Sequence, residues 1–390
     1  MATKRTNGEG SITLAKDGRW TARIQIGKNP NGSARIKAFY GKTKTEATKK
    51  MREYQHQNNS ANIDYAKDSF DDYILRWFEL YKSRSLRPTS YDRNEGIIRN
   101  QLIPFFGYLQ LGNVSVDHIQ KYMNKLQDDG YSYTTLEKSK HLLNGCFKYA
   151  LTKQDVKYNP VSGVVMPSRD GFETKEIIIL DEDDMAKFIS YATQTHSNGE
   201  PVYRYGHGLV FMMYTGLRLG EALALKWSDI NLETRIVNIK GNAVTVKNRV
   251  KADEEDPNFI VKINNPKTKR GLREVYMSQT AVKAILNLKN TMKPTKESEY
   301  VFATASGKIV GKRNVQRTVT SISTKADLSI PHCNVHALRH TFASMLFRKG
   351  VDIKTISALL GHSNVNFTYN RYVHLIQEQK YSAIDLLDTL

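Results

Sequence analysis

Side chains that could do chemistry gather in three short stretches in the second half of the chain. The first stretch, MMYTGLRLGEALALKW, places Arg218 at a Thr-Gly break between two apolar helical segments, three residues before Glu221. The second stretch, HCNVHALRHTFASML, brings His336, Arg339 and His340 within one helical turn. An arginine in so apolar a setting must pair with an acid or face a site. For Arg218 both readings stay open at this point.

The third stretch, LLGHSNVNFTYNRYVH, adds His362 and two tyrosines, Tyr369 and Tyr372. Arginine forks match the non-bridging oxygens of a phosphodiester, and two of them could neutralise a five-coordinate phosphorus without Mg²⁺. A phenol, with a pKa of about 10, becomes a useful nucleophile when its surroundings favour the anion. Histidines can assist its deprotonation. The set therefore predicts phosphoryl transfer through one of the two tyrosines.

A metal site is the alternative reading of the second stretch. Together, His332, Cys333, His336 and His340 could mimic a zinc cluster. The metalloprotease motif requires a glutamate directly after its first histidine, where this chain has Ala337. No carboxylate or second cysteine lies nearby in the sequence to complete four ligands. We therefore expect no bound metal.

The net charge of +19 over 390 residues favours a polyanionic partner, most often nucleic acid. Residues 1–60 hold thirteen Lys or Arg against four Asp or Glu, so close to half of the excess positive charge lies in this short part of the chain. No run of eighteen apolar residues and no N-terminal apolar segment occur, so we expect no membrane span and no secretory signal. The distant Cys146 and Cys333 suggest no disulfide framework, which fits a reducing cytoplasm.

The N-terminal part reads as a small sheet followed by a helix. RWTARIQIG and SARIKAFYG alternate apolar and polar residues, as half-buried strands do, with the turn signal NPNG between them. TKTEATKKMREYQHQ then carries helix formers. A basic three-stranded sheet backed by one helix can lay its strands in a DNA major groove. We expect its aromatic side chains Trp20, Phe39 and Tyr40 to lie in the core.

Helical patterns follow as far as about residue 158 and predict a compact domain of four amphipathic helices, the second ending at Pro104. Polar QNNSAN and residues 159–176 read as linkers on either side. The remainder combines helices with a strand, RIVNIKGNAVTV, and a hairpin, FIVKINNPKTKRGLREVYM, that turns at NPKTKRG. The sequence thus predicts a multidomain chain, mainly α with small β-sheets. Its expected domains are residues 1–58, 64–160 and 175–390.

Four motifs, in this order and spacing, resemble those of the tyrosine recombinases, in the branch of phage and conjugative-transposon integrases: TGLRLGEAL (215–223), PKTKRGLREV (266–275), HALRHTFAS (336–344) and LLGHSNVNFTYNRYVH (359–374). The resemblance covers essentially the whole chain. It implies an arm-type DNA-binding domain with a three-stranded sheet and a helix, a helical core-binding (SAM-like) domain, and a mixed α+β catalytic domain with a C-terminal tail. The last two domains would clamp core sites on DNA while the first holds distal sites.

The resemblance also implies which residues are catalytic, namely Arg218, Lys267, His336, Arg339, His362 and Tyr372. The two arginines would clamp the phosphate, with Glu221 as structural partner of the first. Lys267, at the hairpin tip, would protonate the leaving 5′-oxygen, with Lys269 as the alternative.

Position within the motifs implies the roles of the remaining side chains. The family's nucleophile lies ten residues after the last histidine, which selects Tyr372 and leaves Tyr369 as a packing neighbour. His362 would donate to a non-bridging oxygen. His340, next to the second arginine, would then be a packing or supporting residue.

The implied reaction is site-specific recombination. Tyr372 would form a 3′-phosphotyrosyl bond and free a 5′-hydroxyl, and a 5′-hydroxyl from the partner duplex would reverse the step on a new strand. The bond energy stays in the covalent link, so neither metal, cofactor nor ATP is needed. The implied role is integration and excision of a phage genome or other mobile element in the cytoplasm of a bacterial host.

The implied partners are double-stranded DNA with core and arm attachment sites, three further copies of the chain in a homotetramer, an excisionase and a host DNA-bending protein. Apolar residues of the tail, Ile384, Leu386 and Leu387, could dock on a neighbouring copy or on their own domain. A type IB topoisomerase would use the same chemistry without a partner site, but the basic N-terminal module argues against it. A non-catalytic DNA-binding regulator would leave the six catalytic candidates unexplained.

Overall fold

The computed structural model describes residues 11–15, 18–28, 33–59, 68–172, 177–265, 271–292, 298–330, 332–362 and 364–372. The chain divides into two compact units, Met1–Glu173 and Thr174–Leu390. The first unit contains a small sheet and a helical bundle, and the second combines helices with short antiparallel strands. This confirms a mainly α fold with small β-sheets, while the exact limits of the three expected domains stay predictions.

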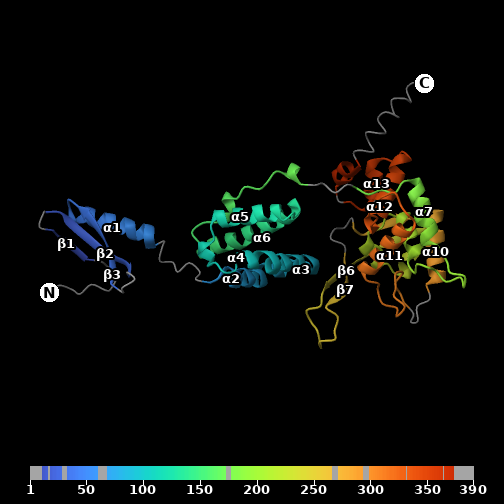
Figure 1. Ribbon diagram of the computed structural model, residues 1–390, viewed down its shortest axis with the longest axis horizontal. Helices are drawn as coiled ribbons and strands as arrows, with labels where there is room; N and C mark the ends of the chain where they lie inside the picture. The colour runs from blue at the N-terminus through green and yellow to red at the C-terminus, as the bar shows by residue number, and fades with distance from the viewer. Residues whose placement is uncertain are drawn as a thin grey trace, which may run out of the picture. The chain divides into compact units, whose positions relative to one another are not determined.

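The N-terminal sheet has three antiparallel strands in the order β1-β2-β3: β1 (Ser11–Leu14), β2 (Trp20–Lys28) and β3 (Ala34–Gly41). Helix α1 (Lys44–Asn59) packs against β2 and β3 (Figure 1). A small core joins them, built from Ala22, Ala47 and Met51 with Ile12, Trp20, Ile24 and Phe39 packed against it. The predicted sheet and helix are thus confirmed.

One expected core residue of this sheet, Tyr40, lies on its open face. Cross-strand pairing sets Phe39 opposite Ala22 and Tyr40 opposite Thr21. Because successive side chains of a strand point to opposite faces, Phe39 joins the core and Tyr40 faces away from it. Tyr40 is 54% exposed, with the guanidinium of Arg19 5.7 Å from its ring centre. The prediction of a core position was therefore wrong for Tyr40.

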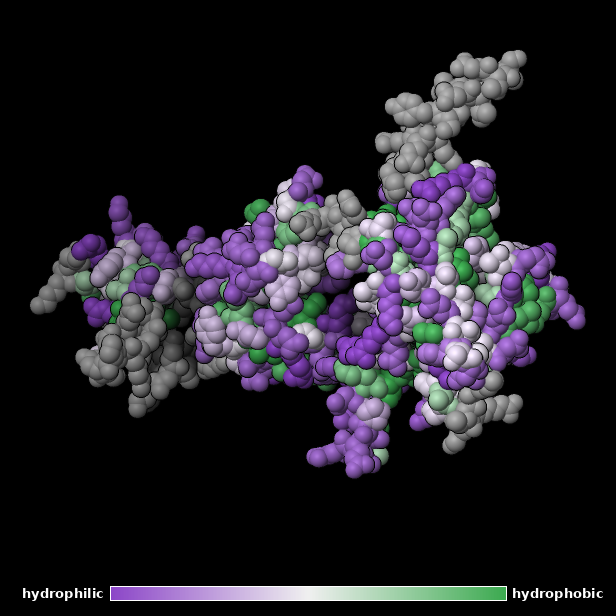
Figure 2. All heavy atoms as spheres, turned by 45° about the vertical axis from the view of Figure 1, so that its right-hand side comes forward, coloured by the Kyte–Doolittle hydropathy of each residue, from purple (hydrophilic) through white to green (hydrophobic). Residues whose placement is uncertain are grey.

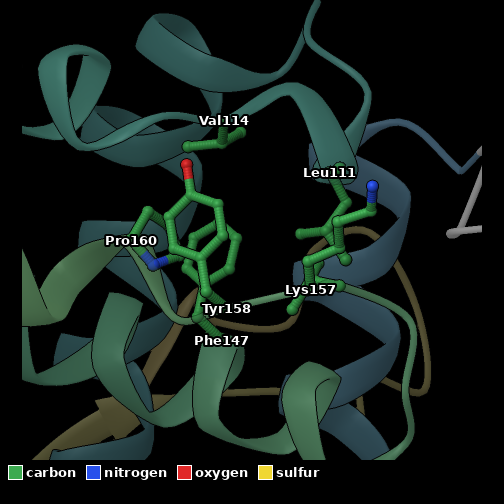
Figure 3. A pocket seen from close by; sticks show the side chains of 8 residues that line it. Leu111, Val114, Phe147, Lys157, Tyr158 and Pro160 are labelled. Carbon is green, nitrogen blue, oxygen red and sulfur yellow. The ribbon is translucent and has the colours of Figure 1, made fainter. Parts of the chain in front are cut away.

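The helical bundle of the first unit consists of α2 (Phe70–Trp77), α3 (Pro88–Ile97), α4 (Ile103–Phe106), α5 (Val116–Asp128) and α6 (Tyr133–Thr152). Phe70 lies 5.2 Å from Phe106 and 6.3 Å from Phe147 between ring centres, at the heart of its core. Beside this core is a pocket of about 240 Å³ (Figure 3), lined by Leu111, Gly112, Val114, Phe147, Val156, Lys157, Tyr158 and Pro160. The chemistry-bearing stretches lie in the other unit.

The helices of the second unit are α7 (Glu182–Ala192), α8 (Gly206–Met213), α9 (Leu219–Ala224), α10 (Gln279–Thr291), α11 (Lys312–Lys325), α12 (Val335–Arg348) and α13 (Ile353–Leu360), and residues 365–372 are also helical. Helix α8, GHGLVFMM, is apolar on all sides because it packs against α7, α10 and α12. The core therefore forms around α8. The first chemical stretch begins at the end of α8, and the second lies just before and within α12.

The strands of the second unit pair differently from the expected hairpin. Strands β4 (Ile230–Asn231), β5 (Ile236–Ile239) and β8 (Arg273–Tyr276) form one antiparallel sheet. Strands β6 (Asn242–Lys247) and β7 (Phe259–Asn264) form a separate hairpin that extends from the body of its unit (Figure 1). The predicted pairing of FIVKIN with REVY was therefore wrong, and RIVNIKGNAVTV is two strands of different sheets.

Hydrophilic residues cover most of the face shown in Figure 2, and hydrophobic residues lie there in small separate groups. Within the described ranges, no helix combines the length and the apolar character needed to cross a membrane.

Candidate active site

The turn that presents Arg218 depends on Gly216. Helix α8 ends at Met213, and Gly216 has a φ of 63°, in the left-handed region that favours glycine. A Cβ at this position would lie 2.4 Å from Cδ1 of Phe342 on α12. The chain then places Arg218 at the N-cap of α9, where its backbone N–H donates to Oε2 of Glu221 at 2.9 Å. The Thr-Gly break thus fixes both the direction and the partner of Arg218.

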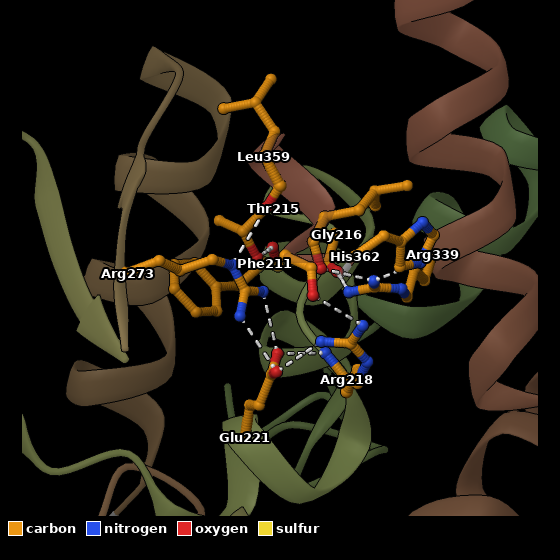
Figure 4. A network of polar contacts seen from close by, with 11 residues as sticks. Phe211, Thr215, Gly216, Arg218, Glu221, Arg273, Arg339, Leu359 and His362 are labelled. Carbon is orange, nitrogen blue, oxygen red and sulfur yellow. Dashed lines mark hydrogen bonds and ion pairs between the residues drawn. The ribbon is translucent and has the colours of Figure 1, made fainter. Parts of the chain in front are cut away.

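Glu221 is a buried carboxylate that binds two arginines (Figure 4). Arg218 Nη1 donates to Oε1 at 2.8 Å, and Arg273, the first residue of β8, donates to both oxygens at 3.0 Å. Burial raises the pKa of Glu221, but the hydrogen bonds and charges of Arg273 and Arg218 outweigh this and lower it to about 2. The expected ion pair is confirmed. The Arg218 side chain is nevertheless 35% exposed, so it can also reach a ligand.

Arg339 and Arg218 donate to the backbone carbonyls of consecutive residues (Figure 4). Arg339 Nη2 donates to Leu360 O at 2.6 Å, and Arg218 Nη2 donates to Gly361 O at 3.2 Å. A further bond, from Arg339 Nη1 to Gly216 O at 2.6 Å, ties α12 to the turn after α8. Burial and the charge of Arg218 lower the pKa of Arg339, although a guanidinium stays protonated at neutral pH. Two cations from distant sequence positions therefore converge on the end of α13.

His362 joins this cluster through Arg339. Arg339 Nη2 lies 3.0 Å from His362 Nε2, and Thr368 Oγ1 lies 2.7 Å from Nδ1. Because a guanidinium only donates, Nε2 must be the acceptor, so in the neutral ring Nδ1 carries the proton and donates to Thr368. Burial and the nearby arginines lower the pKa of His362 to about 3, so the ring is neutral at pH 7.

His336 is the second residue of α12 and is exposed to solvent, although its ring is partly desolvated. Burial and the charges of Arg339 and Arg218 lower its pKa. Neither ring nitrogen has a hydrogen-bond partner among the described residues. His336 is therefore available to donate to a bound anion.

Tyr372 lies in the same unit, and its hydroxyl forms a hydrogen bond with His340. Its Oη is 2.8 Å from His340 Nδ1, and the two rings meet edge to face with centres 6.0 Å apart. The ring of Tyr372 is 2% exposed and packs with Ala343, Phe347, Ile356 and Leu360. Burial raises its pKa to about 12, against the lowering effect of Arg339 and Arg371. By contrast, Tyr369 is 44% exposed.

Of the six predicted catalytic residues, five lie in the described part of the second unit. Arg218, Arg339 and His362 form one network of hydrogen bonds around the end of α13. Tyr372 contacts His340, the residue after Arg339, and the charges of both arginines lower the pKa of His336. Lys267, the alternative Lys269 and the C-terminal tail lie outside the described residues.

Three contributors to the site were not predicted as such. Arg273 stands in the motif PKTKRGLREV, yet its pairing with Glu221 follows from β8 pairing with β5, which the sequence alone did not reveal. Thr368 lies four residues before Tyr372, on the same helical face, a spacing that could have drawn attention to it. His340, expected as a packing or supporting residue, contacts the hydroxyl of Tyr372.

Comparison with known proteins identifies the chain as a tyrosine recombinase, an enzyme that cuts and rejoins DNA strands. The family model for the phage integrase family matches residues 179–379, and that for the phage integrase N-terminal SAM-like domain matches residues 69–127. The chain belongs to the phage integrase family.

Individual relatives agree with this membership. The tyrosine recombinase XerC-like protein of Caldanaerobacter subterraneus subsp. tengcongensis is 31% identical, over 94% of this chain and 95% of its own length. In fold, the chain is similar to the Tn1549 transposon integrase in complex with a circular intermediate DNA (TM-score 0.64, 19% identity, 78% of this chain and 95% of that one). It is also similar to a lambda integrase tetramer bound to a Holliday junction (TM-score 0.57, 15% identity, 94% and 96%).

Proposed function

We propose that this recombinase integrates and excises a mobile element by cutting DNA with Tyr372 while arginines and histidines hold the scissile phosphate. The observation that carries the proposal is the convergence of Arg218 and Arg339 on the carbonyls of two consecutive residues, Leu360 and Gly361. Each guanidinium has five N–H groups, and the bonds to protein use only part of them. The remaining donors can bind the non-bridging oxygens of one phosphodiester bidentately.

The neutral histidines complete the phosphate site in this proposal. His336 would donate a hydrogen bond to a non-bridging oxygen. His362, held by Thr368 and Arg339, would turn its Nε2 toward the phosphate when DNA draws Arg339 onto the same oxygens. Two fixed guanidinium charges beside the phosphate would stabilise the charge that builds on five-coordinate phosphorus. A divalent metal is therefore not required for that purpose.

In the cleavage step, Tyr372 Oη forms a bond to phosphorus and the bond from phosphorus to the 5′-oxygen breaks. The products are a 3′-phosphotyrosyl link and a 5′-hydroxyl, whose proton would come from Lys267. Because Tyr372 is 2% exposed, this step requires its ring to leave the packed position when DNA binds. Attack by the 5′-hydroxyl of a second duplex reverses the chemistry and rejoins the strands in a new combination.

The larger assembly follows from this chemistry. Exchange of two strand pairs needs four active sites, so we propose a cyclic homotetramer on two DNA sites, like the lambda integrase tetramer on its Holliday junction. Within each chain, residues 1–58 would bind arm sites, residues 64–160 core DNA, and residues 175–390 would catalyse. An excisionase and a host DNA-bending protein would set the direction of recombination in the bacterial cytoplasm.

The open face of the N-terminal sheet supports the first of these assignments. Arg23 is exposed there, paired across the strands with Ala38, and exposed Ile36 and Tyr40 occupy the neighbouring same-face positions of β3. A face with a cation, a phenol and apolar groups suits both phosphates and base edges of a major groove.

A nicked core-site DNA tests the proposal. Cleavage of such a suicide substrate releases a short fragment, so the covalent protein–DNA adduct accumulates and is counted on a denaturing gel. Wild type and Tyr369→Phe should form the adduct, and Tyr372→Phe should not. Adduct that persists in Tyr372→Phe and disappears in Tyr369→Phe would reject the assignment of the nucleophile.

A further inference from the structure

His340 makes a direct contact with the reacting atom of the proposed nucleophile. Its Nδ1 lies 2.8 Å from Tyr372 Oη, within the distance over which a side chain can take a proton. Helix α12 holds the His340 ring from one side, and the helical residues 365–372 present Tyr372 from the other. No other hydrogen bond of the Tyr372 hydroxyl occurs among the described residues. The contact is thus between a potential base and the proton that strand cleavage must remove.

The surroundings of His340 keep its ring neutral in the unbound enzyme. The charged and titratable groups that face it are Arg371 and Tyr372 on residues 365–372, and His336 and Arg339 on its own helix. Burial, Arg371 and these helix neighbours lower the pKa of His340 to about 4. A neutral imidazole has one nitrogen with a free lone pair, so Nδ1 can accept the phenolic hydrogen when Nε2 carries the ring proton.

The other two histidines are less suited to this task. His362 has both ring nitrogens engaged, one by Arg339 and the other by Thr368. His336 has no hydrogen bond to Tyr372 in the described structure, and it sits where its pKa responds to both phosphate-clamping arginines. Among the described histidines, the hydrogen bond to Tyr372 therefore distinguishes His340 from His336 and His362.

On the proposed function, we infer that His340 is the general base that accepts the phenolic proton of Tyr372 during strand cleavage. The Oη–H bond breaks and its proton passes to His340 Nδ1, while an oxygen electron pair forms the bond to phosphorus. The phosphorus–5′-oxygen bond breaks, and the leaving oxygen takes its proton from the separate general acid. In rejoining, the His340 imidazolium returns the proton to Tyr372 as the phosphotyrosyl bond breaks.

Binding of the DNA phosphate favours proton transfer to His340, which the unbound site does not. An anion that enters beside His340 favours the imidazolium, and phosphorus that bonds to Oη makes the phenolic proton more acidic. His340 can therefore remain neutral before DNA binds and still accept the proton as the bond forms. Because Tyr372 must move for attack, this inference requires the His340 contact to be kept during that movement.

Full-length His340→Asn and His340→Ala test this inference. An asparagine amide can stand near the position of Nδ1 and keep a hydrogen bond to Tyr372, but it cannot take a proton. Single-turnover cleavage of the nicked core site should slow by about 100-fold or more in both variants, since general-base catalysis typically contributes about 10²–10⁴-fold. The variants' rates should rise steadily with pH, as hydroxide replaces the base, whereas the wild-type rate should level off once His340 is neutral. Rejoining of the isolated adduct should slow as well.

The matched control is His332→Ala, which changes an exposed histidine four residues before His336 and should cleave at the wild-type rate. Circular dichroism and core-DNA binding establish that each variant is folded. A wild-type rate and pH profile in His340→Asn would overturn the inference and leave His340 as a positioning residue. Faster cleavage in either variant would overturn it in favour of a restraint on Tyr372. Adduct formation by Tyr372→Phe would instead reject the proposed function itself.

Discussion

At the scale of single residues, the site is organised around one buried carboxylate. Glu221 is 7% exposed and holds Arg218 and Arg273, so it positions the cation that we propose binds the phosphate. Without this carboxylate, the positively charged arginines would repel one another in a partly buried site. The carboxylate therefore stabilises the empty site and leaves a net positive charge for DNA.

Removal of the Glu221 charge should make the second unit easier to unfold. Glu221→Gln leaves Arg273, which is 8% exposed, without its counter-ion, so the free energy of unfolding should fall by about 3–5 kcal/mol. Urea denaturation followed by circular dichroism measures the change. Glu233→Gln, at an exposed position, should stay within about 0.5 kcal/mol of wild type. An equal, small effect in both variants would contradict the structural role of Glu221.

The buried histidines make stability depend on pH. The folded-state pKa values of His340 and His362 are lowered to about 4 and about 3, below the unfolded value of about 6.5. The unfolded chain therefore binds more protons in this range, and the stability that these groups contribute above pH 6.5 is lost as pH falls towards 4 and 3.

The substitution His362→Gln should reduce this pH dependence. It removes at most one linked proton, so the slope of the unfolding free energy between pH 4 and 6 should flatten by up to about 1.4 kcal/mol per pH unit. Urea unfolding at several pH values measures the slope, with His332→Gln at an exposed position as the reference. A steeper slope in His362→Gln would show that His362 is charged in the folded protein.

The sequence alone led to most of these side chains but not to their contacts. Arg218 and Glu221 are three residues apart, so their pairing is local and predictable. Arg273 reaches Glu221 across 52 residues, and this contact exists only because β8 pairs with β5. The same limit applies to His340 and Tyr372, 32 residues apart, where the motifs indicated a nucleophile but not what binds its hydroxyl.

At the scale of elements, turns and caps decide where Arg218 and Arg339 point. The left-handed Gly216 lets the chain leave α8 and enter α9 within a few residues, and α12 packs its Phe342 against the same turn. Arg339 Nη1 then donates to the Gly216 carbonyl. One turn thus positions both Arg218 and Arg339, the first through the chain and the second through a hydrogen bond.

The substitution Gly216→Ala should disturb both arginines. A left-handed backbone costs a residue with a Cβ about 1–2 kcal/mol, and the new methyl group would meet Phe342 at 2.4 Å. Stability should therefore fall by more than this amount, and adduct formation should fall with it. Thermal unfolding and the nicked-substrate assay measure the two effects. Gly96→Ala in α3, where a Cβ meets nothing within 4 Å, should be neutral or slightly stabilising, and loss of adduct there would refute the explanation.

Elements were predictable where the signal was local. Ser115 caps α5 by accepting the N–H of His118 at 3.3 Å, and serine is a residue type that favours this position. The expected stop at Pro104 was wrong because π-helical residues Ile98–Leu102 lead into α4, and the wider turn accommodates the missing N–H and the ring of proline. The prediction of strand pairing failed for another reason. Alternation of apolar and polar residues reveals a strand but does not identify its partner strand.

At the scale of the whole molecule, the charge of +19 sets how the enzyme meets DNA. Close to half of the excess lies in residues 1–60, far along the chain from the arginine cluster of the active site. We therefore expect that substitutions in the N-terminal part can change the affinity for DNA without changing strand cleavage by the C-terminal part. Most of the N-terminal charge should act through phosphate contacts, which release counterions and make binding sensitive to salt.

Salt titration of DNA binding by the full-length protein tests this division of labour. Each phosphate contact contributes about −0.9 to the slope of log affinity against log salt, so Arg23→Gln on the open face of the N-terminal sheet should make the arm-site slope shallower by about 1. The same variant should bind isolated core sites and form the covalent adduct as wild type does. Lys187→Gln, exposed on α7 beside the acidic Glu182 and Asp183, should leave both slopes unchanged. If Arg23→Gln kept the wild-type arm-site slope, or if it lowered core-site cleavage instead, the N-terminal sheet would not be the surface that grips distal DNA.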